Sequence, residues 1–158
     1  MKLYHGTNKA FCKVDLMVSK PNKDFGKGFY LSPDYEQALN MARIKTEQQQ
    51  EGEPIVMEFE VSETVMNTLR VLRFDDYSED WANFILANRS NSTDRPIHDY
   101  DIVIGPIAND RVGVQLWRYE SQLIDLPTLV RKLKYMKGMT VQYFFGTEKA
   151  ISILNLIK

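Results

Sequence analysis

The sequence has a single cysteine, Cys12, and only two histidines, His5 and His98, among its 158 residues. One cysteine excludes an intramolecular disulfide, and these three side chains are too few for a zinc site of the usual Cys/His type. No metal is expected. The fold must therefore rest on a hydrophobic core, and a chain of this length can bury one without a covalent or metal cross-link.

The sequence also has little net charge, because 20 Lys and Arg balance 21 Asp and Glu to give a formal charge of −1. This balance does not indicate a nucleic-acid or membrane-surface protein at the level of the whole chain, although local patches remain possible. The sequence lacks an apolar run long enough to cross a bilayer, and its opening, "MKLYHGT", has no apolar segment of a secretion signal. We expect one globular domain over residues 1–158, located in the cytoplasm and without a membrane partner.

Strand and helix patterns alternate unevenly along the chain. Period-two and aromatic runs predict strands at 2–5, 55–61, 69–74, 101–104 and 140–145, and a short aromatic strand behind a glycine hinge in "GKGFYLS" at 26–32. Helical spacing and capping residues predict helices at 33–49 with Ser32 as N-cap, at about 79–89 behind Ser78, at 126–138, and after Gly146 with Ala150, Ile151, Leu154 and Ile157 facing inward. The connections are too long and irregular for a doubly wound parallel sheet, so the pattern favours an α+β fold.

Three of the predicted strands place a distinctive side chain close to a glycine. His5 precedes Gly6, Tyr30 follows Gly28, and Gln142 comes four residues before Gly146. Each has an ordinary structural explanation on its own: a histidine bonded to a backbone carbonyl, a core aromatic, and a solvent-facing strand position. Their order along the chain carries the functional argument.

That order resembles the ADP-ribosyltransferase superfamily, on its poly(ADP-ribose)-polymerase and diphtheria-toxin side. The resemblance lies in "YHGT" at 4–7, "FGKGFYLS" at 25–32 and a late "VQYFF" strand at 141–145. The chain also looks like a bacterial domain family of unassigned function with the same core, in which "DYDIVIGPIANDRV" and "QYFFGTEKAI" are recognisable. The resemblance implies a split β-sandwich of two small, mainly antiparallel sheets with flanking helices, and NAD as co-substrate.

The resemblance also implies roles for individual residues. His5 would donate a hydrogen bond to the adenosine-ribose hydroxyl, the Gly6 backbone would bond the nicotinamide amide, and Tyr30 would stack on the nicotinamide ring. The implied catalytic residues are His5, Tyr30 and Gln142, and the implied NAD-binding residues are His5, Gly6, Thr7, Gly26, Gly28, Tyr30, Ser32 and Met41.

Two residues depart from the polymerase pattern. Gln142 stands where the polymerases have a glutamate, so the strand brings no negative charge to a developing ribosyl cation. Met41 stands where some polymerases have a second stacking tyrosine. From the two departures together we expect no chain elongation. We expect transfer of a single ADP-ribose to a protein or nucleic-acid acceptor with release of nicotinamide. The alternatives are an NAD glycohydrolase toxin paired with a small antitoxin, and an NAD-binding module with little or no turnover.

Two further segments leave alternatives open. The first segment is a Gly-Pro turn flanked by Asp101, Asn109, Asp110 and Arg111. In one alternative these residues contact the acceptor or the NAD pyrophosphate, with Arg111 as the anion partner. In the other they form a polar turn that hydrogen-bonds to itself. "RKLKYMK" at 131–137 would either meet an acidic partner or nucleic acid, or be a solvated helix face, which is the simpler explanation.

Overall fold

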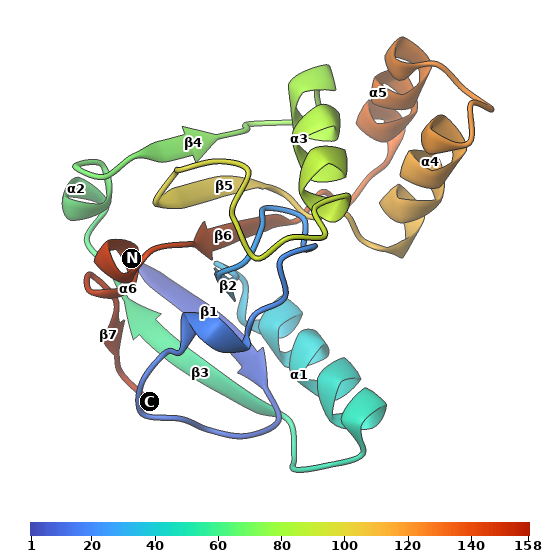
Figure 1. The fold of residues 1–158 in the computed structure, drawn as a ribbon. Helices are drawn as coiled ribbons and strands as arrows, with labels where there is room; N and C mark the ends of the chain where they lie inside the picture. Colours follow the sequence, from blue (N-terminus) through green and yellow to red (C-terminus); the bar gives the residue numbers. More distant parts are fainter.

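Two small β-sheets form the centre of the molecule in a computed structural model that describes all residues from Met1 to Lys158 (Figure 1). The three-stranded sheet has the order β1-β3-β7, and the four-stranded sheet has the order β2-β6-β5-β4. Their bounds are β1 Lys2–Thr7, β2 Phe29–Leu31, β3 Ile55–Glu60, β4 Val71–Arg73, β5 Ile102–Pro106, β6 Val141–Phe145 and β7 Asn155–Leu156. Every neighbouring pair is antiparallel except β4 and β5. The structure thus confirms an α+β fold with two mainly antiparallel sheets.

Helices flank both sheets. Their bounds are α1 Tyr35–Gln49, α2 Glu63–Met66, α3 Glu79–Arg89, α4 Asp110–Glu120, α5 Leu126–Tyr135 and α6 Glu148–Ile151, with a 3₁₀ turn at Leu16–Val18. Helix α1 lies along β1, whereas α3, α4 and α5 gather at the opposite end of the molecule (Figure 1). None of the helices is both long and apolar enough to span a membrane.

The four-stranded sheet buries both of its faces because successive side chains of a strand point to opposite sides. Phe145 of β6 faces the three-stranded sheet and packs in one core with Leu3 and Phe59. Its neighbour Phe144 faces the other way and packs in a second core with Trp81 of α3 and Leu133 of α5. Gln142 lies two residues before Phe144, so strand geometry places it on the same face as this second core.

The N-cap of α1 is Asp34, whereas the prediction was Ser32. The carboxylate of Asp34, not the hydroxyl of Ser32, accepts hydrogen bonds from the first turn of the helix, at 2.9 Å from the Glu36 nitrogen and 3.4 Å from that of Gln37. Ser32 is held elsewhere because its backbone pairs with Tyr4 through two hydrogen bonds of 2.7 Å. This pairing joins β1 to the end of β2.

One prediction about the second half of the chain is wrong, and one helix was not predicted. The helix expected after Gly146 is the single turn α6, followed by β7, which pairs with β3, and Ile157 is 49% exposed instead of facing inward. The segment after the Gly-Pro turn continues into α4, whose first turn is capped by Asn109 through a 3.0 Å hydrogen bond from the Val112 nitrogen.

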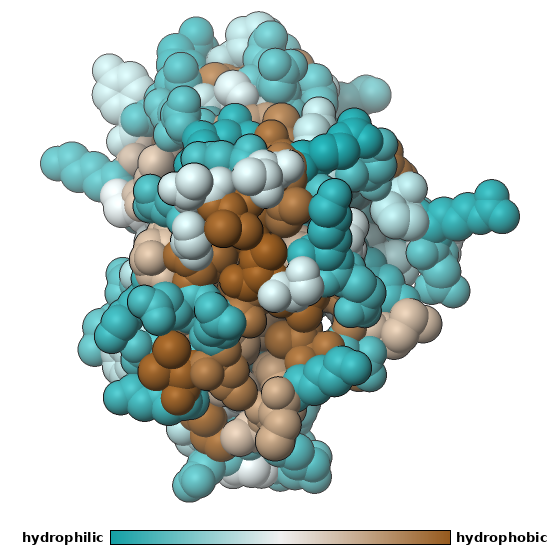
Figure 2. Space-filling view, turned by 90° about the vertical axis from the view of Figure 1, so that its left-hand side faces the viewer, coloured by the Kyte–Doolittle hydropathy of each residue, from teal (hydrophilic) through white to brown (hydrophobic).

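The face that carries α2, α6 and β7 shows apolar surface between hydrophilic side chains (Figure 2).

Candidate functional site

A cleft of about 460 Å³ lies between α1, the ends of β1 and β2, and the loop at 18–23. This volume falls in the range of about 300–1,000 Å³ that small-molecule sites occupy. The cleft is lined by Tyr4, His5, Gly6, Val18, Lys20, Lys23, Tyr30, Leu31, Ser32, Gln37, Ala38, Met41, Ile44, Lys45, Gln48, Gln49, Ile107 and Gln142. The candidate residues that meet here are therefore His5, Gly6, Tyr30, Ser32, Met41 and Gln142.

Three candidate NAD-binding residues do not line the cleft. Thr7 is buried and its hydroxyl donates to the Lys9 carbonyl at 3.2 Å, which is a local turn. Gly26 has a φ of +102°, a backbone conformation that favours glycine. At Gly28 the reason for glycine is steric, because a Cβ there would lie 2.3 Å from the Phe144 ring. These glycines pack the loop before β2 onto the second core, and they act on the cleft by positioning Tyr30.

Tyr30 presents a fixed ring to the cleft. Its hydroxyl donates to the Gly26 carbonyl at 2.6 Å and accepts from the Phe25 nitrogen at 3.0 Å, and burial raises the pKa of the phenol. The hydroxyl is thus occupied and does not ionise near neutral pH, so the ring face is what Tyr30 offers a ligand. The Lys23 ammonium lies 5.5 Å from the ring centroid, within range of a cation–π contact.

The backbone of Gly6 is directed at the gap between β1 and β2. In an antiparallel pair, residues alternate between bonding the partner strand and pointing away from it. Because Tyr4 bonds Ser32 on the side away from β3, Gly6, two residues later, points its N–H and C=O to that same side. No backbone hydrogen bond joins Gly6 to β2, since the strands part beyond the Tyr4–Ser32 bridge. The position is well suited to bind an amide group.

His5 is neutral and has a fixed tautomer. Its Nδ1 lies 2.8 Å from the Tyr30 carbonyl oxygen, which can only accept, so Nδ1 carries the proton. Burial, together with Lys45 and Lys23 nearby, lowers the pKa of His5 to about 4. Nε2 is then an acceptor, so a ribose hydroxyl would donate to His5, the reverse of the direction that the family resemblance implies.

The lowered pKa of His5 predicts a pH dependence of stability. The unfolded chain takes up this proton near pH 6.5 and the folded protein only near pH 4, so the free energy of unfolding falls as the pH drops between these values and is flat above them. The full loss is about 3 kcal/mol. Urea unfolding at pH 7 and pH 4.5 should show most of it, and His5→Gln should remove most of the difference.

His98 provides the control for this measurement because burial lowers its pKa as well. His98→Gln should retain the share of the pH dependence that belongs to His5. Equal slopes in the wild type and in His5→Gln would show that His5 is not held neutral by burial.

Gln142 enters the cleft on the same sheet face as Tyr30. Tyr30 pairs with Phe144, and Gln142 lies two residues before Phe144, which makes Gln142 and Tyr30 diagonal neighbours across the two strands. The Nε2 atom of Gln142 is buried and has no hydrogen-bond partner. An unpaired buried amide costs about 1–3 kcal/mol, so a ligand that accepts from this group gains stabilisation.

The cleft is electropositive, which the sequence did not suggest. Lys20, Lys23 and Lys45 line it, and no Asp or Glu does. Burial and the two neighbouring ammonium groups lower the pKa of Lys23. Lys45 follows Met41 by one helical turn, so helix periodicity alone would have placed it beside that candidate; Lys20 and Lys23 lie on a loop whose path no local pattern indicates. This charge favours a ligand that carries phosphates.

The polar residues of the segment from Asp101 to Arg111 do not line the cleft, although the first of the two alternatives for this segment required it. Asp101 accepts from the Arg70 nitrogen at 3.0 Å and from the Thr147 hydroxyl at 2.7 Å, and Asn109 caps α4. Arg111 lines a groove between α4 and α5, and only Ile107 of this segment lines the cleft. The structure therefore gives Arg111 no contact with the cleft, and the lysines supply its positive charge.

Comparison with known proteins adds a family but no activity. A family model described as "Protein of unknown function (DUF3990)" matches residues 1–156. The search of curated proteins finds no match.

Proposed function

The chain belongs to the DUF3990 family, and we propose that it is an NAD-dependent enzyme of the ADP-ribosyltransferase type, which transfers one ADP-ribose to a macromolecular acceptor and releases nicotinamide. The observation that carries the proposal is the meeting of His5, Tyr30 and Gln142 in one cleft. These residues come from three motifs spread over almost the whole chain. The two small sheets, joined at the Tyr4–Ser32 bridge and open beyond it, are compatible with the split β-sandwich of that superfamily.

Each part of the cleft suits one part of NAD. The open backbone of Gly6 can bond the carboxamide, and the Tyr30 ring can stack on the nicotinamide, for which Lys23 must leave the ring face. The Nε2 atom of His5 can accept from a ribose hydroxyl, and the cleft lysines can pair with the pyrophosphate. When bound, NAD supplies a glycosidic bond whose cleavage develops positive charge on the ribose.

The charge of the cleft bears on the rate of that cleavage. Gln142 is neutral and the surrounding lysines are cationic, so the residues present do not stabilise a developing positive charge. We therefore propose slow turnover for the enzyme. The same observation favours a second candidate function, an NAD-binding module without turnover.

The test is incubation of the pure protein with NAD, with and without cell lysate, while free nicotinamide is measured. Release that requires a macromolecule supports a transferase, and release without one supports a glycohydrolase, the activity expected of a toxin with a small antitoxin partner. Binding by calorimetry without release supports the binding module. Absence of both binding and release would overturn the proposal.

Gln142→Glu should raise the rate of nicotinamide release by about tenfold to a hundredfold, because a carboxylate at this position faces the developing cation. The lysines that line the cleft should keep the new carboxylate ionised at neutral pH. The control is Asn83→Asp on the exposed face of α3, the same amide-to-acid change outside the cleft, which should leave release unchanged. A rate that stays at the wild-type value in Gln142→Glu would show that Gln142 does not face the reacting bond.

A further inference from the structure

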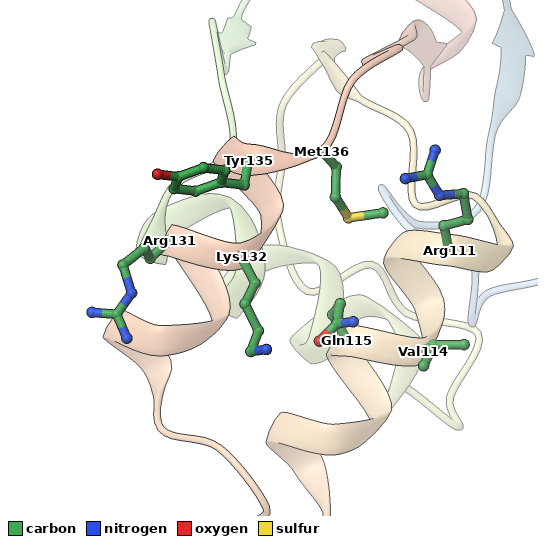
Figure 3. A pocket seen from close by; sticks show the side chains of 7 residues that line it. All are labelled: Arg111, Val114, Gln115, Arg131, Lys132, Tyr135 and Met136. Carbon is green, nitrogen blue, oxygen red and sulfur yellow. The ribbon is translucent and has the colours of Figure 1, made fainter.

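A second surface with binding character lies on α4 and α5. A groove of about 630 Å³ runs between the two helices, and a neighbouring hollow of about 630 Å³ lies on the outer side of α5. In Figure 3, Lys132 and Met136 point toward α4, whereas Arg131 and Tyr135 point away from it. We call the groove and the hollow together the α4–α5 surface.

The α4–α5 surface is lined by basic side chains and by no acidic one. Its cations are Arg111, Arg131, Lys132, Lys134 and Lys137, and no Asp or Glu lines either hollow. None of these five cations takes part in an ion pair, since the ion pairs of the protein lie elsewhere. In a chain with a formal net charge of −1, this is a local concentration of positive charge.

Tyr135 adds an aromatic ring to this surface. It is 87% exposed, the most exposed of the large apolar side chains, and it lines both hollows together with Arg131 one helical turn before it. The side chains that α5 packs into the core are Leu129 and Leu133, which are fully buried. Tyr135 is therefore not required by the core, and its ring is exposed to a partner.

We infer that the α4–α5 surface binds single-stranded nucleic acid. Cations spaced around a free aromatic ring match a strand whose phosphates pair with Lys and Arg while a base stacks on the ring. A duplex keeps its bases stacked on one another and offers no base face to Tyr135. An acidic protein segment would match the charge but would make no use of the exposed aromatic ring of Tyr135.

The α4–α5 surface begins close to the cleft along the chain. Ile107 lines the cleft, and α4 begins three residues later at Asp110. A strand seated on the α4–α5 surface can thus extend toward the cleft. If the proposed function holds, the strand is the acceptor of ADP-ribose; its binding to the surface does not depend on that function.

The test uses the full chain and a fluorescein-labelled 12-nucleotide single strand of mixed sequence, as RNA and as DNA, with binding followed by fluorescence anisotropy and without NAD. With three or four phosphate contacts, the logarithm of the binding constant should fall with the logarithm of salt concentration with a slope of about −2 to −3. Lys132→Gln combined with Lys134→Gln should weaken binding by about tenfold or more, and Tyr135→Ala should weaken it by about tenfold. The control pair Lys13→Gln and Arg43→Gln removes two exposed cations elsewhere and should retain wild-type affinity.

Three results would overturn the inference. One is the absence of binding to either strand at low salt, and another is equal affinity in the wild type and in both α4–α5 variants. The third is binding that poly-glutamate displaces as readily as the unlabelled strand and that Tyr135→Ala leaves unchanged, which would identify an acidic protein segment as the partner. Because NAD is absent, these results are independent of the outcome for nicotinamide release.

Discussion

Tyr30→Ala should lower the affinity for NAD by about a hundredfold and bring nicotinamide release below detection. The phenol hydroxyl is occupied by Gly26 and Phe25, so the ring face is the group that Tyr30 presents to the cleft. Stacking on a planar, partly cationic ring combines aromatic contact with cation–π attraction, and alanine offers neither. The affinity is measured by calorimetry and the release by the assay described above.

Tyr30→Phe separates the stacking role from the structural role of the same residue. Phenylalanine keeps the ring and loses the hydroxyl, which leaves the Phe25 nitrogen and the Gly26 carbonyl without this partner and costs about 1–3 kcal/mol of stability. We expect its NAD affinity to stay within a few-fold of the wild type while its melting temperature falls. Unchanged binding and release in a folded Tyr30→Ala protein would refute the assignment of the cleft.

Gly6→Ala should reduce the free energy of unfolding by about 3 kcal/mol or more. A Cβ on Gly6 would lie 2.0 Å from the Ala38 carbonyl oxygen and 2.8 Å from the Ala42 nitrogen. Both atoms belong to the backbone of α1, so no side-chain rotation relieves the clash and the helix must move away from β1. Overpacking of this kind typically costs about 1–3 kcal/mol and more where backbone must shift. Urea unfolding measures the loss.

The matched control is Gly113→Ala in α4, where an added Cβ meets nothing within 4 Å. This substitution should stabilise the protein by up to about 1 kcal/mol, because alanine has the higher helix propensity. In Gly6→Ala the displaced α1 would also carry Met41 and Lys45 away from their places in the cleft, so NAD binding should fall with stability. A Gly6→Ala protein as stable as the wild type would mean that α1 does not depend on this close contact.

Local sequence patterns were sufficient to predict a helix or strand where its apolar periodicity and capping residues lie within one short segment. Alternating apolar residues from Ile55 to Val61 predicted β3, and Ser78 followed by Trp81 and Ile85 predicted the capped and buried face of α3. The ordered motifs also selected six of the residues that line the cleft. These features depend on backbone preferences and hydrophobic periodicity, which act within a few residues.

Local patterns failed where a distant segment decides the conformation. The last residues have apolar spacing that suits a helix, yet they form β7 because the edge of β3 offers them backbone partners, with the Glu58 nitrogen 2.8 Å from the Lys158 carbonyl oxygen. The placement of Arg111 was likewise decided at a distance, because α4 packs against α5 and Arg111 lines the groove between these two helices instead of the cleft.

The sequence by itself determined the α+β composition, most of the strands, and the set of motif residues from which the cleft is built. Only the tertiary structure decided that Lys20, Lys23 and Lys45 surround those residues without a carboxylate, that His5 turns its acceptor nitrogen away from Tyr30, and that Arg111 belongs to another surface. The physical reason is that electrostatic environment and hydrogen-bond direction arise between segments far apart in the chain, whereas periodicity and capping arise within one.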